Sequence, residues 1–340
     1  MDRNALKRFM SEHRFRKPCV ILNPKAGSGR ARRRWTALHP ALEDALGPID
    51  ARFTEAPEHA TELTREVLEA GADLVIATGG DGTLNEVVNG YFSNRAAVSP
   101  GAALALIPLG TGGDFRRSAR VPQSPGEAIA TIANGNPQQI DACRVQLTGL
   151  GGETIERYCI NVASFGLGGD VAVAGKSNFL TPYSGTAAFL WATTFSFLRY
   201  RPKAVRLSLD GNSASEPVRI MEVVLGNGGY HGGGMLPCPL AELDSGYLEV
   251  TVIKEVPFIE FLRATPILYS GKIHSHPQCR HYRVKTITAS SDEIVLAEID
   301  GEALGSLPLS AEILPGAIRF VGLGGADEAT GSAPINPGGA

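Results

Sequence analysis

The sequence has little that would mark a disulfide-bonded, membrane-spanning or nucleic-acid-binding protein. Its five cysteines are scattered without any CxxC pair, which argues against a zinc site and for reduced thiols in the cytoplasm. The cluster of His274, His276 and His281 has no locally spaced carboxylate or thiolate to complete a metal site, so we expect surface histidines there. The most apolar stretch, residues 185–198, is shorter than the about 20 residues that a bilayer-spanning helix needs. We interpret this stretch as a buried or interfacial helix.

Charge is nearly balanced over the chain but unevenly distributed along it. The formal net charge is −3, so the molecule as a whole does not have the charge of a polyanion binder, and we expect no nucleic acid partner. The first 34 residues nevertheless carry eleven lysines and arginines against Asp2 and Glu12. Such a region suits phosphates or anionic lipid head groups, and a solvated basic face explains it equally well. The basic start lacks the apolar segment of a secretory signal, so we expect a cytoplasmic protein.

Residues 18–137 alternate between predicted strands and predicted helices. This alternation with short links is typical of an α/β domain with a doubly wound, mostly parallel sheet. The strands are expected at 19–23, 51–54, 73–78 and 103–107, and the helices at 30–46, 57–70, 83–92 and 125–134.

Residues 138–322 have a different pattern, with several short strand candidates separated by turn signals. This pattern favours a second domain built as an antiparallel β-sandwich or barrel. Its last strands could pair with either domain, which blurs the boundary. The tail at 323–340 is rich in Gly, Ala and Pro and is expected to be disordered. The strand candidates are 205–209, 219–225, 247–253, 287–289, 293–299 and 317–321, with one helix at 257–269.

Three glycine-containing loops follow predicted strands of the first domain. They are residues 23–29 (NPKAGSG), 79–83 (GGDGT) and 108–114 (PLGTGGD). The carboxyl ends of parallel strands meet at one edge of the sheet, which is where ligands bind in such folds. Glycines let the backbone approach a ligand closely, and the helix start after GGDGT offers N–H groups to anionic oxygens. The sequence therefore predicts a nucleotide site at this edge.

Acidic residues in and after these loops indicate a metal ion. Asp81 and Asp114 would repel phosphate unless a divalent cation stood between them. Taken alone, GGDGT is also compatible with a tight turn capped by Asp81 and Thr83. Near the carboxyl end, Asp300-Gly301-Glu302 follows a predicted strand, and by itself Asp-Gly is simply a hairpin turn. The motif gains chemical meaning if the second domain folds back on the first.

The order NPKAGSG, GGDGT, PLGTGGDF and DGE resembles the diacylglycerol kinase and sphingosine kinase-like lipid kinases, in particular their soluble bacterial branch. The resemblance covers about residues 18–322. It implies a first domain like that of NAD kinases and phosphofructokinases, a β-sandwich second domain, and ATP bound between them. It also implies Asp300 as general base, and Asp81, Asp114 and Glu302 as the organisers of a catalytic Mg²⁺. The implied ATP contacts are Asn23, Pro24, Lys25, Gly27, Thr54, Gly79, Gly80, Asp81, Gly82, Thr83, Leu84, Asn85 and Thr111.

Two departures from the family pattern bear on the metal sites. Gly113 stands where the third motif usually has asparagine. Asp244-Ser245-Gly246 replaces the Asp-Asp-Gly of a structural magnesium loop, which leaves Asp244 as the remaining candidate ligand there.

We interpret the chain as an ATP- and Mg²⁺-dependent lipid kinase with diacylglycerol as the default acceptor. It would contact the membrane surface reversibly, as a peripheral protein in the cytoplasm, and a homodimer stays open. The alternatives are a ceramide or sphingoid-base kinase, an NAD kinase, and an inactive lipid-binding regulatory homologue.

Overall fold

The computed structural model describes residues 14–176, 199–213 and 216–324. Two of the expectations above, on the apolar stretch at 185–198 and on the tail at 323–340, therefore fall wholly or largely outside the described residues. Of the basic amino-terminal region only residues 1–13 are not described, and residues 14–34 carry eight of its eleven basic residues.

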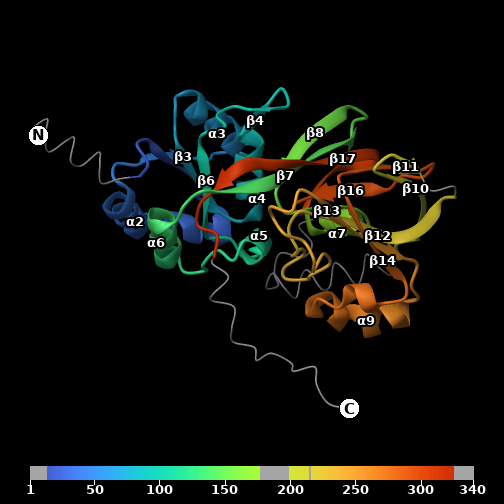
Figure 1. Cartoon of the computed structure of the whole chain (residues 1–340). Coiled ribbons are helices and arrows are strands. Elements are labelled where there is room, and N and C mark those ends of the chain that lie inside the picture. The colour runs from blue at the N-terminus through green and yellow to red at the C-terminus, as the bar shows by residue number, and fades with distance from the viewer. Residues whose placement is uncertain (1–13, 177–198, 214–215, 325–340) are drawn as a thin grey trace, which may run out of the picture.

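The first domain is a parallel sheet covered by helices on both faces (Figure 1). Its strand order is β2-β1-β3-β6, and all three pairings are parallel. Apolar side chains of α2 and α6 pack on one face of the sheet, and those of α3 and α4 pack on the other. The elements are β1 (Pro18–Leu22), α2 (Ala26–Leu46), β2 (Asp50–Phe53), α3 (His59–Glu69), β3 (Leu74–Gly79), α4 (Asp81–Gly90), β6 (Ala103–Pro108) and α6 (Pro125–Asn134).

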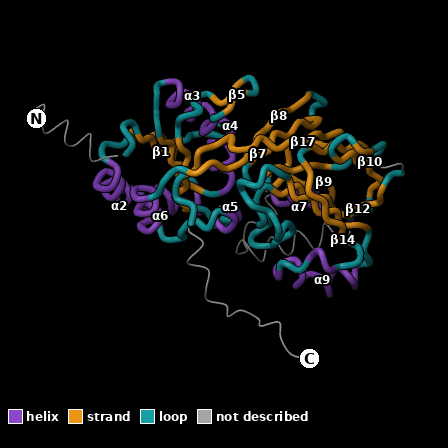
Figure 2. The backbone as a smooth tube through the Cα atoms, viewed as in Figure 1, coloured by secondary structure: helices purple, strands orange, loops and turns teal. Residues whose placement is uncertain are grey.

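The second domain consists mostly of antiparallel strands, as the strand-rich half of Figure 2 shows. Inward side chains from its two halves form one apolar core that includes Val145, Phe165, Val223 and Leu309. The fold class predicted from the sequence is confirmed. The elements are β7 (Gln138–Gly149), β8 (Thr154–Cys159), β9 (Val162–Gly166), α7 (Leu167–Lys176), β10 (Lys203–Leu209), β11 (Asn212–Ser213), β12 (Val218–Gly226), β13 (Leu248–Lys254), α9 (Phe258–Ser270), η2 (Ile273–Ser275), β14 (Cys279–Val284), β15 (Thr286–Ser290) and β16 (Leu296–Ile299).

One long strand, β17 (Glu302–Phe320), joins the two domains. Along most of its length it pairs antiparallel with β7, and it also pairs with β15 and β16. Its last residues, Arg319 and Phe320, pair in parallel with Ala103 and Leu104 of β6. The chain thus returns to the first sheet after building the second domain, and the Asp300-Gly301-Glu302 turn stands at the start of this returning strand.

Several elements differ from the sequence prediction. The strands β7, β8, β9 and β14 and the helix α7 were not predicted, and the last strand is much longer than the predicted 317–321. The short elements β4 (Phe92–Ser93), β5 (Ala96–Ala97) and α5 (Asp114–Ser118) were also not predicted.

The expectation of surface histidines is wrong, because His274, His276 and His281 are all partly buried. The rings of His274 and His281 also contact each other. These two rings stack at 4.4 Å between centroids, and His281 contacts the buried carboxylate of Glu249. All five cysteines are buried and free.

Candidate active site

The GGDGT loop leads directly from β3 into the amino terminus of α4. The first hydrogen bond of the helix runs from the Leu84 N–H to the Gly80 carbonyl at 3.0 Å, and no side chain caps Gly80. A side chain at position 79 would place its Cβ 2.5 Å from Thr83 Oγ1, so this strand end requires glycine. The turn therefore presents the first amides of a helix without a side-chain cap, which is an arrangement that favours anionic oxygens.

The loop after β6 packs against the GGDGT loop backbone to backbone. The amides of Leu109 and Gly110 both donate to the Gly79 carbonyl, at 2.8 and 3.0 Å. A Cβ on Gly110 would lie 2.4 Å from Gly80 Cα, so only glycine allows this approach. The second and third predicted loops therefore form one continuous surface at the carboxyl edge of the sheet.

The loop after β1 completes this surface. Asn23 Nδ2 donates to Thr83 Oγ1 at 3.3 Å, and Asn23 Oδ1 accepts the Lys25 N–H at 2.9 Å. Gly27 has a φ of +58°, and a Cβ there would lie 2.4 Å from the Leu109 carbonyl oxygen. The three loops predicted to share one edge thus meet in space.

Other predicted nucleotide contacts lie around the same edge. Thr54 is buried and continues β2, and its N–H donates to the Leu22 carbonyl at 2.9 Å. Pro24 is half-buried, whereas Lys25 and Thr111 are exposed.

Asp81 joins the second and third loops through backbone amides. Its Oδ2 accepts the N–H groups of Gly113 and Asp114 at 2.8 and 3.2 Å, and its Oδ1 accepts that of Phe115 at 3.2 Å. Burial raises the pKa of Asp81, and the neighbouring Asp114 carboxylate raises it further, against the lowering effect of the three amides. Asp81 therefore organises the start of α5, which is a structural contribution that the sequence did not suggest.

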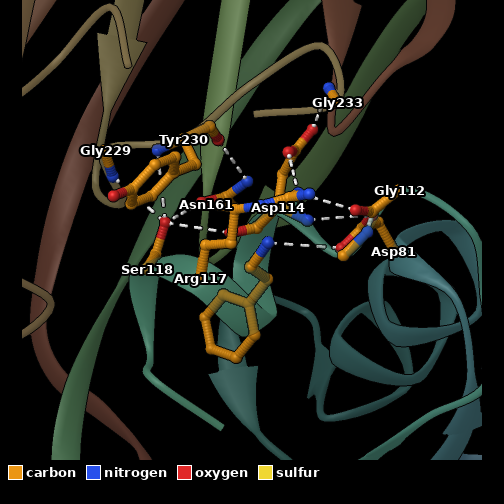
Figure 3. Close-up of polar contacts among 11 residues, drawn as sticks. Asp81, Gly112, Asp114, Arg117, Ser118, Asn161, Gly229, Tyr230 and Gly233 are labelled. Atoms are coloured by element: carbon orange, nitrogen blue, oxygen red, sulfur yellow. Dashed lines mark hydrogen bonds and ion pairs between the residues drawn. The ribbon is translucent and has the colours of Figure 1, made fainter. Parts of the chain in front are cut away.

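Asp114 is buried at the junction of the two domains. Its Oδ1 lies 3.0 Å from Arg117 Nη1, and its Oδ2 accepts the Gly233 N–H from the second domain at 2.7 Å (Figure 3). Arg117 also donates to the Gly112 carbonyl at 2.6 Å. Asp114 thus holds a second-domain loop against the third glycine-containing loop, residues 108–114.

Ser118 and Asn161 extend this junction and were missed by sequence reasoning. Ser118 Oγ donates to Asn161 Oδ1 at 2.9 Å and accepts the amides of Gly229 and Tyr230 at 3.2 and 3.3 Å (Figure 3). Asn161 Nδ2 in turn donates to the Tyr230 carbonyl at 2.9 Å. The run of glycines at 232–234 was the signal in the sequence that could have indicated this loop.

The Asp300-Gly301-Glu302 turn meets α4. Asp300 Oδ2 accepts Asn85 Nδ2–H at 2.7 Å, and Asp300 Oδ1 accepts the Val162 N–H at 3.1 Å. Burial raises the pKa of Asp300 to about 7, although these two hydrogen bonds lower it. The Glu302 carboxylate also faces the GGDGT loop, because a Cβ built on Gly82 would lie 3.4 Å from Glu302 Oε1. The second domain therefore does fold back on the first.

Comparisons with known proteins agree with this arrangement. Residues 17–145 match the diacylglycerol kinase catalytic domain, and residues 163–322 match the YegS C-terminal NAD kinase beta sandwich-like domain. A probable lipid kinase YegS-like from Stenotrophomonas maltophilia is 30% identical over 293 residues, which is 84% of this chain and 92% of the relative. A diacylglycerol kinase from Staphylococcus saprophyticus is 29% identical over 289 residues, 85% of this chain and 90% of the relative.

The chain belongs to the YegS-like and diacylglycerol kinase family of lipid kinases. Two crystal structures of Bacillus anthracis proteins share its fold over 91% of this chain and 97% of theirs. Their TM-scores are 0.72 and 0.66 at 26% and 24% identity, and the second is described as a diacylglycerol kinase. The family and the kinase activity class that the motifs implied are confirmed.

A group of acidic residues lies next to Asp300, the candidate general base. The sequence did not reveal this group. Glu298 is buried, and its Oε2 accepts the Gly301 N–H at 2.6 Å, which fixes the turn that carries Asp300. Its Oε1 accepts Ser164 Oγ–H at 2.7 Å and lies 3.4 Å from His231 Nε2. Burial alone would lower the pKa of His231, but Glu298 and three further carboxylates raise it overall. When protonated, His231 is therefore the counter-ion of this acidic group.

The residues of this site are better suited to binding phosphate groups than to coordinating a metal ion with protein ligands alone. Within 14–176, 199–213 and 216–324, no three His, Cys, Asp or Glu side chains are placed to hold a metal ion. Asp81 and Asp114 use their oxygens for the hydrogen bonds given above, whereas the Glu302 carboxylate makes no hydrogen bond or ion pair with the described residues. Mg²⁺ commonly binds one or two carboxylates together with substrate phosphates and water, and Glu302 fits that role.

The loop of the expected structural magnesium site contacts a buried carboxylate through its backbone. Asp244 is exposed. The buried carboxylate here is Asp141, which accepts the Gly246 N–H at 2.6 Å and the Gly316 N–H at 2.8 Å. Asp244 as a structural metal ligand stays a prediction.

Proposed function

We propose that this chain transfers the γ-phosphoryl group of ATP to a lipid hydroxyl, with diacylglycerol as the default acceptor. The observation that carries the proposal is the position of Asp300. Its carboxylate comes from the second domain and is held 2.7 Å from Asn85 on α4, the helix whose amino terminus follows the GGDGT loop. A carboxylate with a pKa of about 7 is suited to accept a proton near neutral pH.

The nucleotide phosphates would lie against the amino terminus of α4. The helix amides beyond Gly80 and the glycine-lined backbone of the three loops supply donors and space for anionic oxygens. Asn23 and Thr54, at the ends of β1 and β2, and the exposed Thr111 would contact the nucleotide from the other loops. This placement uses every loop that meets at the carboxyl edge of the sheet.

Asp300 would act as the general base. Its carboxylate takes the proton of the acceptor hydroxyl, the acceptor oxygen forms a bond to the γ-phosphorus, and the bond from that phosphorus to ADP breaks. Asn85 and the Val162 amide orient the carboxylate. Their hydrogen bonds also lower its pKa, against the raising effect of burial. A positioned base of this kind contributes about 10²–10⁴ in rate.

Mg²⁺ enters the proposal together with the nucleotide. When bound, it would neutralise charge on the phosphates, which is most of what phosphoryl transfer requires of a metal. Glu302 is the carboxylate we assign to it, because that side chain faces Gly82 and has no competing partner among the described residues. Asp81 and Asp114 would act mainly by holding the loops.

The acceptor would be a bilayer lipid reached by reversible contact with the membrane surface from the cytoplasmic side, where ATP is available. In the described part of the chain, none of the helices has the length and apolarity to cross a bilayer. Ceramide and sphingoid bases are the rival acceptors, since the features that support the kinase do not select among lipid hydroxyls.

A phosphotransfer screen tests the proposal. The full chain is incubated with labelled ATP, Mg²⁺ and, separately, diacylglycerol, ceramide, sphingosine, a prenol and NAD, each dispersed in detergent micelles where needed. We expect a labelled lipid that disappears with Asp300→Asn. A labelled NAD product would instead identify an NAD kinase. The absence of every product with folded, ATP-binding protein would favour the inactive lipid-binding homologue.

A further inference from the structure

Helix α9 carries an outward-facing stripe without acidic residues. Exposed residues recur along it at Ile259, Arg263, Pro266 and Tyr269, with helical spacing. Ile259 is 63% exposed and Tyr269 is 43% exposed, which is unusual for side chains of this size. Figure 1 shows α9 at one edge of the second domain, projecting from its sheet.

The exposed charges on this stripe and just beyond its end are positive. Arg263 stands in its middle, and Lys272 is exposed just beyond the end of the helix. The single carboxylate of the helix, Glu260, is half-buried and lies 3.3 Å from His276 Nε2, so it turns toward the domain. The face therefore combines apolar side chains with cations. This combination suits a surface with an apolar interior and anionic groups at its boundary with water.

The inner side of α9 connects this face with the candidate active site. The Leu268 carbonyl accepts the Leu236 N–H at 2.6 Å, and a Cβ on Gly271 would lie 3.3 Å from Leu236 Cδ2. Leu236 belongs to the segment 236–241, whose Leu240 is 57% exposed. The same segment lines a cleft of about 470 Å³ that is also lined by Arg117 and Ser118 of the Asp114 junction.

We propose that the outward stripe of α9, together with Leu240, docks on an anionic lipid bilayer. The choice of a bilayer as the binding partner rests on the proposed lipid kinase activity. A lipid acceptor that resides in a bilayer must reach the cleft that adjoins this face. Apolar side chains of an interfacial helix bury into the boundary between head groups and acyl chains, and nearby cations are attracted to anionic head groups. The face is distinct from the two segments that the sequence suggested for membrane contact.

Vesicle co-sedimentation of the full chain tests this surface without nucleotide. The vesicles are equimolar phosphatidylcholine and phosphatidylserine, with pure phosphatidylcholine as comparison. We expect wild type to bind the anionic vesicles more tightly, and Ile259→Glu to weaken that binding by about tenfold or more. Arg263→Glu should weaken it by a smaller factor that shrinks as salt is added.

Leu150→Glu is the matched control. Leu150 is 71% exposed in the turn between β7 and β8. Figure 1 shows β8 and α9 on different sides of the second domain. The control variant should bind vesicles like wild type, and thermal unfolding should show that all variants are folded. Equal binding by Ile259→Glu and wild type, or an equal loss with Leu150→Glu, would overturn the proposal. The proposal would also be overturned if wild type bound no vesicles. The same holds if Ile259→Glu changed the protein from dimer to monomer without changing its binding to vesicles.

Phosphotransfer to the same acceptor in micelles separates this inference from the proposed function. Ile259→Glu should retain activity there, because micelles deliver the lipid without a bilayer to dock on. Loss of vesicle binding in a protein that phosphorylates no lipid would refute the proposed function and leave the docking surface standing. Full activity on vesicles by a variant that no longer binds them would refute the docking surface alone.

Discussion

The pH dependence of turnover should report the ionisation of Asp300. With a pKa of about 7, the base is about one tenth deprotonated at pH 6 and about nine tenths at pH 8. We therefore expect kcat/KM to rise about tenfold between these two values and then to level off. Asp300→Asn keeps the shape but not the basicity, so its profile should be flat and its turnover lower by about 10²–10⁴.

Asn85→Leu should move this profile to higher pH. The hydrogen bond from Asn85 lowers the pKa of Asp300, so its loss raises that pKa. A hydrogen bond to a charged group is worth about 1.5–3 kcal/mol and one pH unit about 1.4 kcal/mol, so the midpoint should rise by about one to two units.

Asn89→Leu is the control for this shift. Asn89 lies one turn further along α4 and, like Asn85, donates to the Tyr158 carbonyl, but it makes no hydrogen bond to Asp300. The Asn89→Leu change should lower the melting temperature of the protein and leave the midpoint of the pH profile unchanged. The assay is the initial rate of labelled lipid formation at several substrate concentrations, from about pH 5.5 to about pH 9.5, the span that the expected midpoints require. An unchanged midpoint of the pH profile in Asn85→Leu, or an equal shift of that midpoint in Asn89→Leu, would refute the assignment of Asp300 as base.

Three further changes test the surrounding roles. Glu302→Gln should raise the Mg²⁺ concentration needed for half-maximal activity and leave the pH midpoint unchanged, and a Mg²⁺ titration that superimposes on wild type would remove Glu302 from the metal. Asp81→Ala should lower the free energy of unfolding in urea by about 0.5–2 kcal/mol and raise KM for ATP, because three amides lose their acceptor. Burial raises the pKa of Glu222 to about 7, so the folded protein binds more protons than the unfolded chain between the two pKa values and loses stability as pH rises through that window. Glu222→Gln should therefore stabilise the protein at pH 8, on the order of 1–3 kcal/mol, but not at pH 4, and a gain of equal size at both values would contradict this account.

The sequence predicted those parts of the site that are local in the chain. The GGDGT and PLGTGGD loops were found because glycine between a strand and a helix has a local conformational cause, and the structure brings their backbones into contact at Gly80 and Gly110. Glu298 was missed because it sits in a short strand where an acidic residue usually faces solvent. Its burial depends on β9 and on a loop about 70 residues earlier, which sequence periodicity does not reveal.

The same limit explains the missed parts of the fold. The strand β7 was missed although Gly135 and Pro137 mark a turn just before its start. The strand β17 contains Pro308 and Pro315, so the sequence indicated only a short strand near its end. Their long pairing is stabilised by partners more than a hundred residues apart in the chain. The role of Asp81 at the start of α5 was also not predictable, since it depends on how two separate loops pack.

The return of β17 to the first sheet makes the two domains unequal as independent folding units. A fragment that ends near residue 137 would leave β6 without the Arg319–Phe320 partner and expose its edge, which is a template for pairing with other chains. Such a fragment should aggregate when expressed alone. The missing strand, however, is carried entirely by the other fragment, so co-expression should let the second piece insert its terminal strand beside β6 and restore a soluble pair. Cutting the gene at this boundary would thus turn one continuous polypeptide into a two-part assembly whose activity depends on strand donation.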